Sequence, residues 1–182
     1  MAWTAPLTWT PNQVLTAAQL NTHLRDNMLE TEAAKATGGG GYFVATGANA
    51  IAERQAAHAE TTASSTTTAT TYGNLADGIN TSVTVTTGPQ CLILWGCHMQ
   101  ASTTTSITQC SITWSGASAG SADDSYAAYR KLQNYSAYPA QFMHHLWVTG
   151  MTPGSTTFTL KYRILNGGTG TFSTRRIAVF PY

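Results

Sequence analysis

The stretch Thr156-Thr157-Phe158-Thr159-Leu160-Lys161-Tyr162-Arg163-Ile164 alternates between polar and apolar side chains. Successive side chains of a β-strand point to opposite faces of its sheet. The apolar members would therefore line a core, while Thr157, Thr159, Lys161 and Arg163 would face water. The pattern predicts a half-buried strand and a mainly β fold.

The sequence on either side of this strand keeps the two-residue period. Asn166-Gly167-Gly168 is typical of a hairpin turn, and residues 171–180 are expected to form the closing strand. Upstream strands are predicted at residues 81–87, 91–101, 108–114 and 141–149. About seven or eight strands separated by turns predict an antiparallel β-sandwich (jelly roll), a head domain over residues 72–182.

Residues 1–16 differ from the rest, because they carry Trp3, Pro6, Trp9 and Pro11. Proline fixes φ and disfavours helix at the residue before it, so the segment is predicted to be an extended arm. Its tryptophans either fold back on the protein's own domain or insert into a partner protein. The second alternative makes Trp3 and Trp9 candidate anchoring residues.

A single α-helix is predicted over residues 17–37. Thr16 and Gln19 match a capping box, and Leu15 and Leu20 occupy the positions of a hydrophobic staple around it. The glycines that follow are expected to end the helix.

The apolar stripe of this helix consists of Leu20, Leu24 and Met28. So narrow a stripe suits packing against copies of the same helix or in a groove, although packing on its own β-domain stays open. With Leu15, the stripe completes the predicted anchoring surface.

Residues 38–71 are predicted to be a flexible spacer, or stalk. Residues 38–41 are all glycine, and residues 61–71 are almost entirely Thr, Ser and Ala. These compositions give flexibility and too little apolar area to fold alone. Structureless segments of this length are uncommon inside compact domains.

Charged residues make up 9% of the 182 residues, and the net charge is +1, whereas about 25% charged residues is usual. No basic field is available to bind a nucleic acid backbone. No apolar run approaches the roughly 20 residues of a membrane span. We therefore expect neither nucleic acid nor membrane as a partner.

The chain has three cysteines, Cys91, Cys97 and Cys110, and no signal peptide is recognisable before them. The expectation is synthesis in a reducing compartment, where they stay small buried thiols.

Few residues are candidates for catalysis or metal binding. His144 and His145 are adjacent on a predicted strand and point to opposite faces, which indicates one core and one surface histidine rather than a metal site. Asp123 and Asp124 are typical of a solvated turn, although a glycosidase also uses two carboxylates. No nucleotide-binding or nucleophile-elbow motif occurs. The chain is expected to be non-enzymatic, with no catalytic, metal or cofactor site.

Arg175 and Arg176 likewise point to opposite faces of the last strand, so one of them is expected near the core or an interface. A buried charge requires a partner. Asp77, Asp123 and Asp124 are the available acids, and pairing across a subunit boundary also stays open.

Four tyrosines cluster between two predicted strands. Aromatic rings stack on sugars, and tyrosine is also enriched at protein interfaces. The cluster is therefore either a glycan-binding platform or, as we favour, an oligomer interface. Its members are Tyr126, Tyr129, Tyr135 and Tyr138.

Three blocks of the chain resemble a family of tailed-bacteriophage and prophage structural proteins, known as minor tail, head-fibre or decoration proteins. The first block begins with Trp3 and continues with Trp9-Thr10-Pro11 and then Val14-Leu15-Thr16-Ala17-Ala18-Gln19-Leu20-Asn21-Thr22-His23-Leu24-Arg25-Asp26-Asn27. Residues 42–54 are similar to the family's next block, and residues 158–163 and 170–177 to its last two strands.

This resemblance implies a virion component, made in the bacterial host cytoplasm and located on the particle surface. It also implies a homotrimer whose head is a tumour-necrosis-factor-like jelly roll. The arm and helix would attach to the major capsid or tail proteins of the same virion. Alternatively, the head would bind a host receptor or cell-surface glycan.

Overall fold

In the computed structural model, the chain forms two compact units, Met1–Gln55 (the N-terminal unit) and Ala56–Tyr182 (the head). Residues 4–48, 50–131 and 140–182 are described, except for the side chains of residues 32 and 33. Trp3, Tyr135 and Tyr138 lie outside this description. Within it, no helix has the length and apolarity to cross a membrane.

The predicted helix of the N-terminal unit is interrupted rather than continuous. Its capping box is confirmed: the Thr16 hydroxyl accepts from the Gln19 N–H at 3.2 Å, and the Gln19 side chain accepts from the Thr16 N–H at 3.0 Å. The helical segments are α1 (Ala17–Leu20), the π-helix η1 (Asn21–Arg25), α2 (Asp26–Met28) and α3 (Glu32–Lys35).

Thr31 explains the break between α2 and α3. Its hydroxyl donates to the Met28 carbonyl at 2.9 Å and accepts from the Ala34 N–H at 3.4 Å. Threonine side chains compete in this way with the helical backbone. Thr31 therefore ends one helical segment and caps the next.

The predicted spacer is only partly unstructured, and this corrects the sequence-based boundary. Strands β1 (Tyr42–Gly47) and β2 (Ala50–Arg54) form an antiparallel hairpin in the N-terminal unit. Strands β3 (Ala57–Thr61) and β4 (Ser65–Thr67) belong to the head, which begins at Ala56 rather than at residue 72. Both pair with the last strand of the chain, so partners far along the sequence order this Thr-rich segment.

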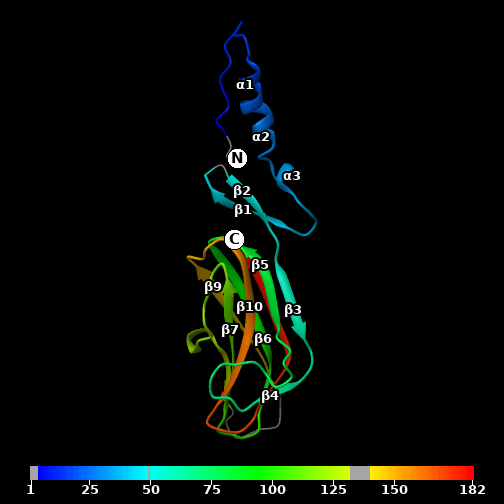
Figure 1. Ribbon diagram of the computed structural model, residues 1–182, viewed down its shortest axis with the longest axis vertical. Coiled ribbons are helices and arrows are strands. Elements are labelled where there is room, and N and C mark those ends of the chain that lie inside the picture. Colours follow the sequence, from blue (N-terminus) through cyan, green and yellow to red (C-terminus); the bar gives the residue numbers. More distant parts are fainter. Residues whose placement is uncertain (1–3, 49, 132–139) are drawn as a thin grey trace. The chain divides into compact units, whose positions relative to one another are not determined.

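The head is an antiparallel β-sandwich of two sheets (Figure 1). The four-stranded sheet has the order β5-β10-β7-β8, and the five-stranded sheet has the order β3-β11-β6-β9, with β4 also paired to β11. The remaining elements are β5 (Ser82–Thr87), β6 (Gln90–Ala101), β7 (Ile107–Gly116), the 3-10 helix η2 (Asp124–Tyr126), β8 (Ala128–Lys131), β9 (Ala140–Thr149), β10 (Gly154–Leu165) and β11 (Gly170–Pro181). The predicted mainly β, jelly-roll-like fold is confirmed.

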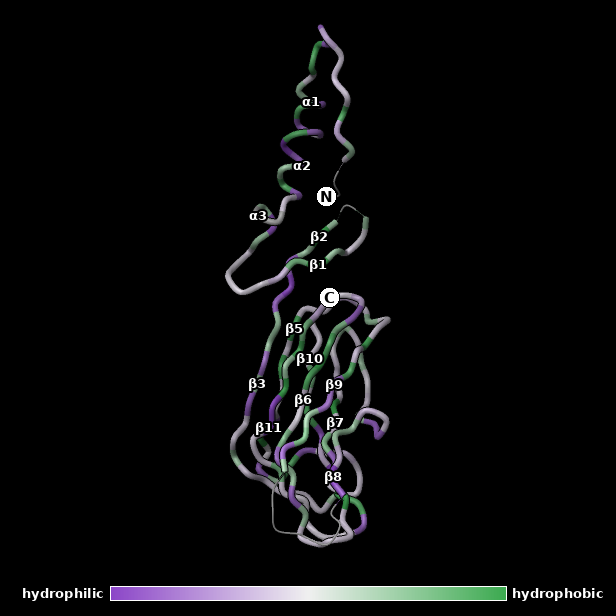
Figure 2. The backbone as a smooth tube through the Cα atoms, turned by 180° about the vertical axis from the view of Figure 1, so that it is seen from behind, coloured by the Kyte–Doolittle hydropathy of each residue, from purple (hydrophilic) through white to green (hydrophobic). Residues whose placement is uncertain are grey.

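Strand β10 buries its apolar side chains, as the alternating pattern of its sequence predicts. The four apolar side chains of residues 158–164 are buried and pair with β7, with Phe158 opposite Trp114. The following turn runs through Asn166, Gly167 and Gly168, which all have positive φ. Figure 2 shows the hydrophobic stretches that line strands such as β6 and β10.

The core lies between the two sheets. Its largest members are Trp95 on β6, Phe158 and Tyr162 on β10, and Phe172 on β11, all almost completely buried. Each such side chain contributes about 1.5–3 kcal/mol of burial free energy relative to exposure. This core holds the outward-facing surfaces of both sheets in fixed positions.

Candidate interaction surfaces

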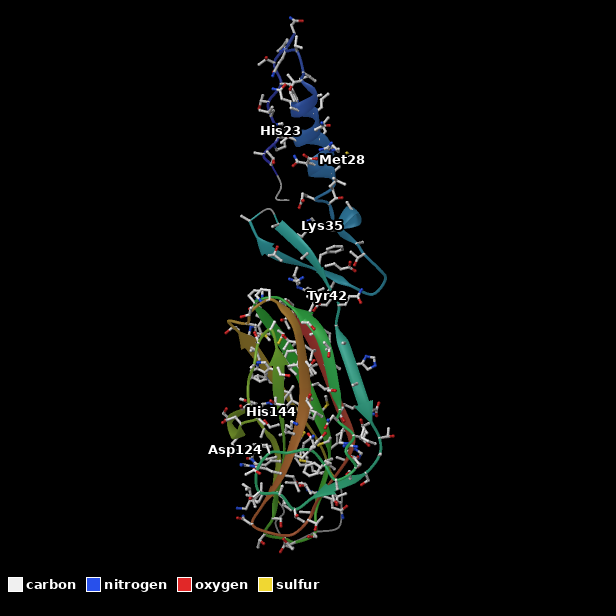
Figure 3. All side chains as sticks on the ribbon, in the orientation of Figure 1. His23, Met28, Lys35, Tyr42, Asp124 and His144 are labelled. Carbon is white, nitrogen blue, oxygen red and sulfur yellow. The ribbon has the colours of Figure 1, made fainter. Side chains whose placement is uncertain are left out.

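The arm folds back along the helix of its own N-terminal unit. The buried side chain of Asn27 accepts from the Thr4 N–H and donates to the Thr4 carbonyl, both at 2.9 Å. One turn earlier, His23 Nδ1 lies 3.1 Å from the Ala5 carbonyl oxygen, on the side of the helix that faces the arm (Figure 3). The Asn27 amide therefore holds the arm backbone much as a neighbouring strand would.

A tight turn produces this reversal. Pro11 and Asn12 occupy its central positions, Asn12 has φ of 67°, and the Gln13 N–H donates to the Thr10 carbonyl at 3.1 Å. Proline followed by a positive-φ residue matches a type II turn. Trp9 stands edge-on to the His23 ring, with centroids 6.4 Å apart, and remains partly exposed.

The apolar residues predicted to anchor the chain are exposed on the N-terminal unit. Leu15, Leu20 and Leu24 are exposed, and Met28 is 68% exposed. The sequence analysis missed Val14, 86% exposed, and Leu29, because neither lies on the four-residue spacing of the stripe. A groove of about 260 Å³ also lies in this region; its lining includes Pro6, Leu24 and Met28. Large exposed apolar patches mark interaction sites.

Replacing Asn27 with alanine should release the arm. The Thr4 N–H loses its acceptor, so its hydrogen exchange should accelerate about tenfold, as expected for a hydrogen bond of about 1.4 kcal/mol. Exchange measured by NMR checks this. Gln13→Ala, which removes only a contact within the turn, should leave Thr4 unchanged. If the Thr4 N–H exchanges as slowly in the Asn27→Ala protein as in the wild type, Asn27 does not hold the arm in place.

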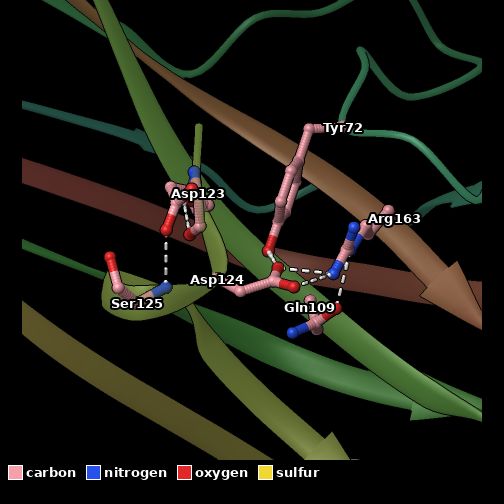
Figure 4. A network of polar contacts seen from close by, with 7 residues as sticks. Tyr72, Gln109, Asp123, Asp124, Ser125 and Arg163 are labelled. Atoms are coloured by element: carbon pink, nitrogen blue, oxygen red, sulfur yellow. Dashed lines mark hydrogen bonds and ion pairs between the residues drawn. The ribbon is translucent and has the colours of Figure 1, made fainter. Parts of the chain in front are cut away.

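Asp123 and Asp124 both form polar contacts within the head (Figure 4). Asp123 caps η2 by accepting from the Ser125 N–H at 2.8 Å, and this contact lowers the pKa of its carboxyl. Asp124 forms an ion pair with Arg163 and accepts from the Tyr72 hydroxyl at 2.7 Å. The two carboxylates thus have separate structural roles, as the predicted turn implies.

Tyr72 and Arg163 extend this network across the four-stranded sheet. The Arg163 guanidinium lies 4.5 Å from the centroid of the Tyr72 ring and donates to Gln109 at 2.7 Å. Burial, followed by the hydrogen bond to Asp124, raises the pKa of Tyr72 above its ordinary value. These contacts fasten the segment before β5 to the outside of the sheet.

The described members of the tyrosine cluster have different environments. Tyr126 donates to the Ser121 carbonyl and packs near Trp114, with ring centroids 6.2 Å apart. Tyr129, on β8, is largely exposed. The glycan-platform and interface alternatives both remain predictions.

His144 and His145 point to opposite faces of β9, as their adjacent positions predict. His144 stacks on the core residue Trp95, with centroids 5.1 Å apart, whereas His145 is exposed. The cysteines are free and buried, and burial raises the pKa of Cys91 to about 12. Among the described residues, no group of three or more His, Cys, Asp or Glu side chains is placed to bind a metal ion.

Arg175 is the buried member of the arginine pair. It forms a 2.7 Å ion pair with Asp77 and donates to the carbonyls of Ala63 and Ile79. Burial alone would raise the pKa of Asp77, but the Arg175 contact and the Ile79 N–H outweigh it and lower that pKa. Arg176 points outward and binds Glu60 at 2.9 Å. Both arginines therefore find partners within the chain.

A surface that the sequence analysis missed lies on the side of the five-stranded sheet that faces away from the core. We call it the outer face. Its side chains form rows across β11, β6 and β9, because residues in these strands pair directly. From one end, the rows are Phe180–Leu92–Trp147, Ala178–Leu94–His145, Arg176–Gly96–Met143 and Ser173–His98–Gln141.

Comparison with known proteins finds a shared fold and no shared family. No family model matches the chain, and no curated protein matches its sequence. Two solved structures of infectious bursal disease virus are similar in fold: the Gx strain (TM-score 0.50, 11% identity) and the VP2 subviral particle (TM-score 0.51, 10% identity). Each match covers 76% of this chain but only 36% and 37% of the viral chains.

A tumour necrosis factor, Eiger from S. frugiperda, is also similar, with a TM-score of 0.46 and 9% identity over 71% of this chain and 92% of that one. At such low identity, the similarity to the two viral structures shows a shared fold alone.

Proposed function

We propose that this protein is a non-enzymatic structural component of a tailed-bacteriophage virion. It is a capsid decoration, head-fibre or minor tail protein that attaches through its N-terminal unit and displays a trimeric head on the particle surface. The resemblance of the N-terminal block and the jelly-roll fold, shared with a viral capsid protein, support this function.

The exposure of apolar side chains on the N-terminal unit carries the proposal. Val44 is the one buried apolar residue among the described residues of this unit, whereas eight large apolar side chains are exposed. Such a unit gains little free energy from its own core. Binding of Leu20, Leu24 and Met28 to capsid or tail proteins would supply the missing burial, at about 25 cal/mol per Å² of apolar surface.

Attachment can be tested with phage that encode altered chains. Removal of residues 1–36, or the double change Leu24→Asp and Met28→Asp, should abolish co-purification of the protein with gradient-purified particles. Arg25→Ala, on the same helix but polar, should leave copy number unchanged. Normal incorporation of the Leu24→Asp, Met28→Asp chain would refute attachment through this surface.

A further inference from the structure

We infer that the outer face of the five-stranded sheet is where the heads associate with one another, in a parallel ring whose axis runs along the strands. This inference specifies the contact for the trimer in the proposed function. Its first support is exposure: Met143 is 65% and Trp147 47% exposed, although both are large apolar residues of strand β9.

The charges of this face suit contact with a second copy. Among the described strand residues that point outward here, Arg176 and Glu60 carry the formal charges, and they form an ion pair within each copy. When this face is buried against another copy, both charges therefore stay paired. An unpaired buried charge, the usual cost of burying charged groups, does not arise. A strongly charged partner would find no complementary field here.

The order of the rows defines the geometry of association. Apolar side chains occupy the end near Phe180, and polar ones occupy the end near His98. A two-fold axis that lies in the interface and runs perpendicular to the strands would place apolar rows against polar rows. Rotation about an axis along the strands instead places each row against itself, so aromatic side chains meet aromatic side chains.

Two features give the face a specific shape. A Cβ at Gly96 would lie 2.2 Å from the Phe142 carbonyl oxygen, so the β6–β9 pairing requires glycine. The same face has a hollow of about 200 Å³, lined by residues that include Leu94, Met143 and Ala178. This volume can receive an apolar side chain of a neighbouring copy.

Parallel association also determines where the chains enter the heads. Ala57, at the start of β3, pairs with Val179, next to the aromatic row. Every copy in such a ring would receive its N-terminal unit at the same end. Attachment would then be multivalent, so weak single contacts would act together.

The test is the molar mass of the full chain in solution, measured by light scattering during size exclusion. The wild-type protein should have the mass of three copies, and Leu94→Glu with Met143→Glu should have that of one, with circular dichroism unchanged. Thr86→Glu, on the outward side of the other sheet, should keep the wild-type mass. A monomeric wild type, or an undiminished mass for the double variant, would overturn the inference.

Cysteine cross-linking tests the parallel arrangement. Leu92→Cys should form disulfides between copies upon mild oxidation, since like rows meet, while the buried native cysteines stay reduced. An antiparallel contact would instead link chains with Leu92→Cys to chains with Gln100→Cys, and would contradict the ring. Particle attachment is read out separately: a wild-type chain that is monomeric and still joins particles refutes this inference and the trimeric head, but leaves the proposed attachment through the N-terminal unit standing.

Discussion

Replacing Arg175 with alanine is expected to lower the free energy of unfolding of the head by about 3–5 kcal/mol, the usual effect of breaking a buried ion pair. The Arg175 side chain is fully buried, on the core side of β11, where a register shift in the pairing with β6 falls between Ser173 and Arg176. Its guanidinium binds Asp77 and two backbone carbonyls of the segment that joins β3 to β5. Alanine would leave these acceptors without their donor.

Urea denaturation, at one protein concentration, measures this loss. Lys161→Ala is the matched control: Lys161 also donates from a strand to a loop, to Asn74 at 2.6 Å, but at the surface. Surface contacts of charged groups contribute about 0–1 kcal/mol, so this change should be small. Equal stabilities for the two variants would mean that the loop is held without Arg175.

The strand pattern of the head was predictable because local and tertiary preferences agree there. Residues 156–164 alternate without exception, and the core between two sheets needs that alternation. The capping box at Thr16 was predictable for the same reason, since its two hydrogen bonds involve residues three apart.

The first strands of the head were not predictable from local pattern. Residues 57–61 have a weak two-residue period, built on Ala57 and Ala59, and residues 65–67 contain no large apolar side chain. Both segments become strands because β11, more than a hundred residues later, offers them an edge. Pairing at that distance leaves almost no trace in the local sequence.

The two candidate surfaces also differ in how far the sequence predicts them. The apolar stripe of the helix was visible as a four-residue spacing, and its members are exposed as an attachment surface requires. The outer face was visible only in part: Leu92 and Leu94 lie in the strand predicted at residues 91–101. Their alignment with Trp147 and Phe180 depends on the register of three strands, which no single segment encodes.

Replacing Trp95 with alanine is expected to destabilise the head by about 3–5 kcal/mol, as for other large aromatic residues in protein cores. Trp95 is completely buried on β6, stacks on His144, and donates through its indole N–H to the Cys110 carbonyl at 3.3 Å. Alanine would leave a cavity between the sheets and remove this hydrogen bond.

Trp95 also lies between Leu94 and Gly96, which face outward from the same strand. A loosened β6 should therefore weaken association of the heads as well as their folding. Denaturation and mass measurements on Trp95→Ala check both effects, with Trp9→Ala as a control because Trp9 belongs to the other unit. Lowered stability with an unchanged mass would show that the outer face does not depend on the core packing beneath it.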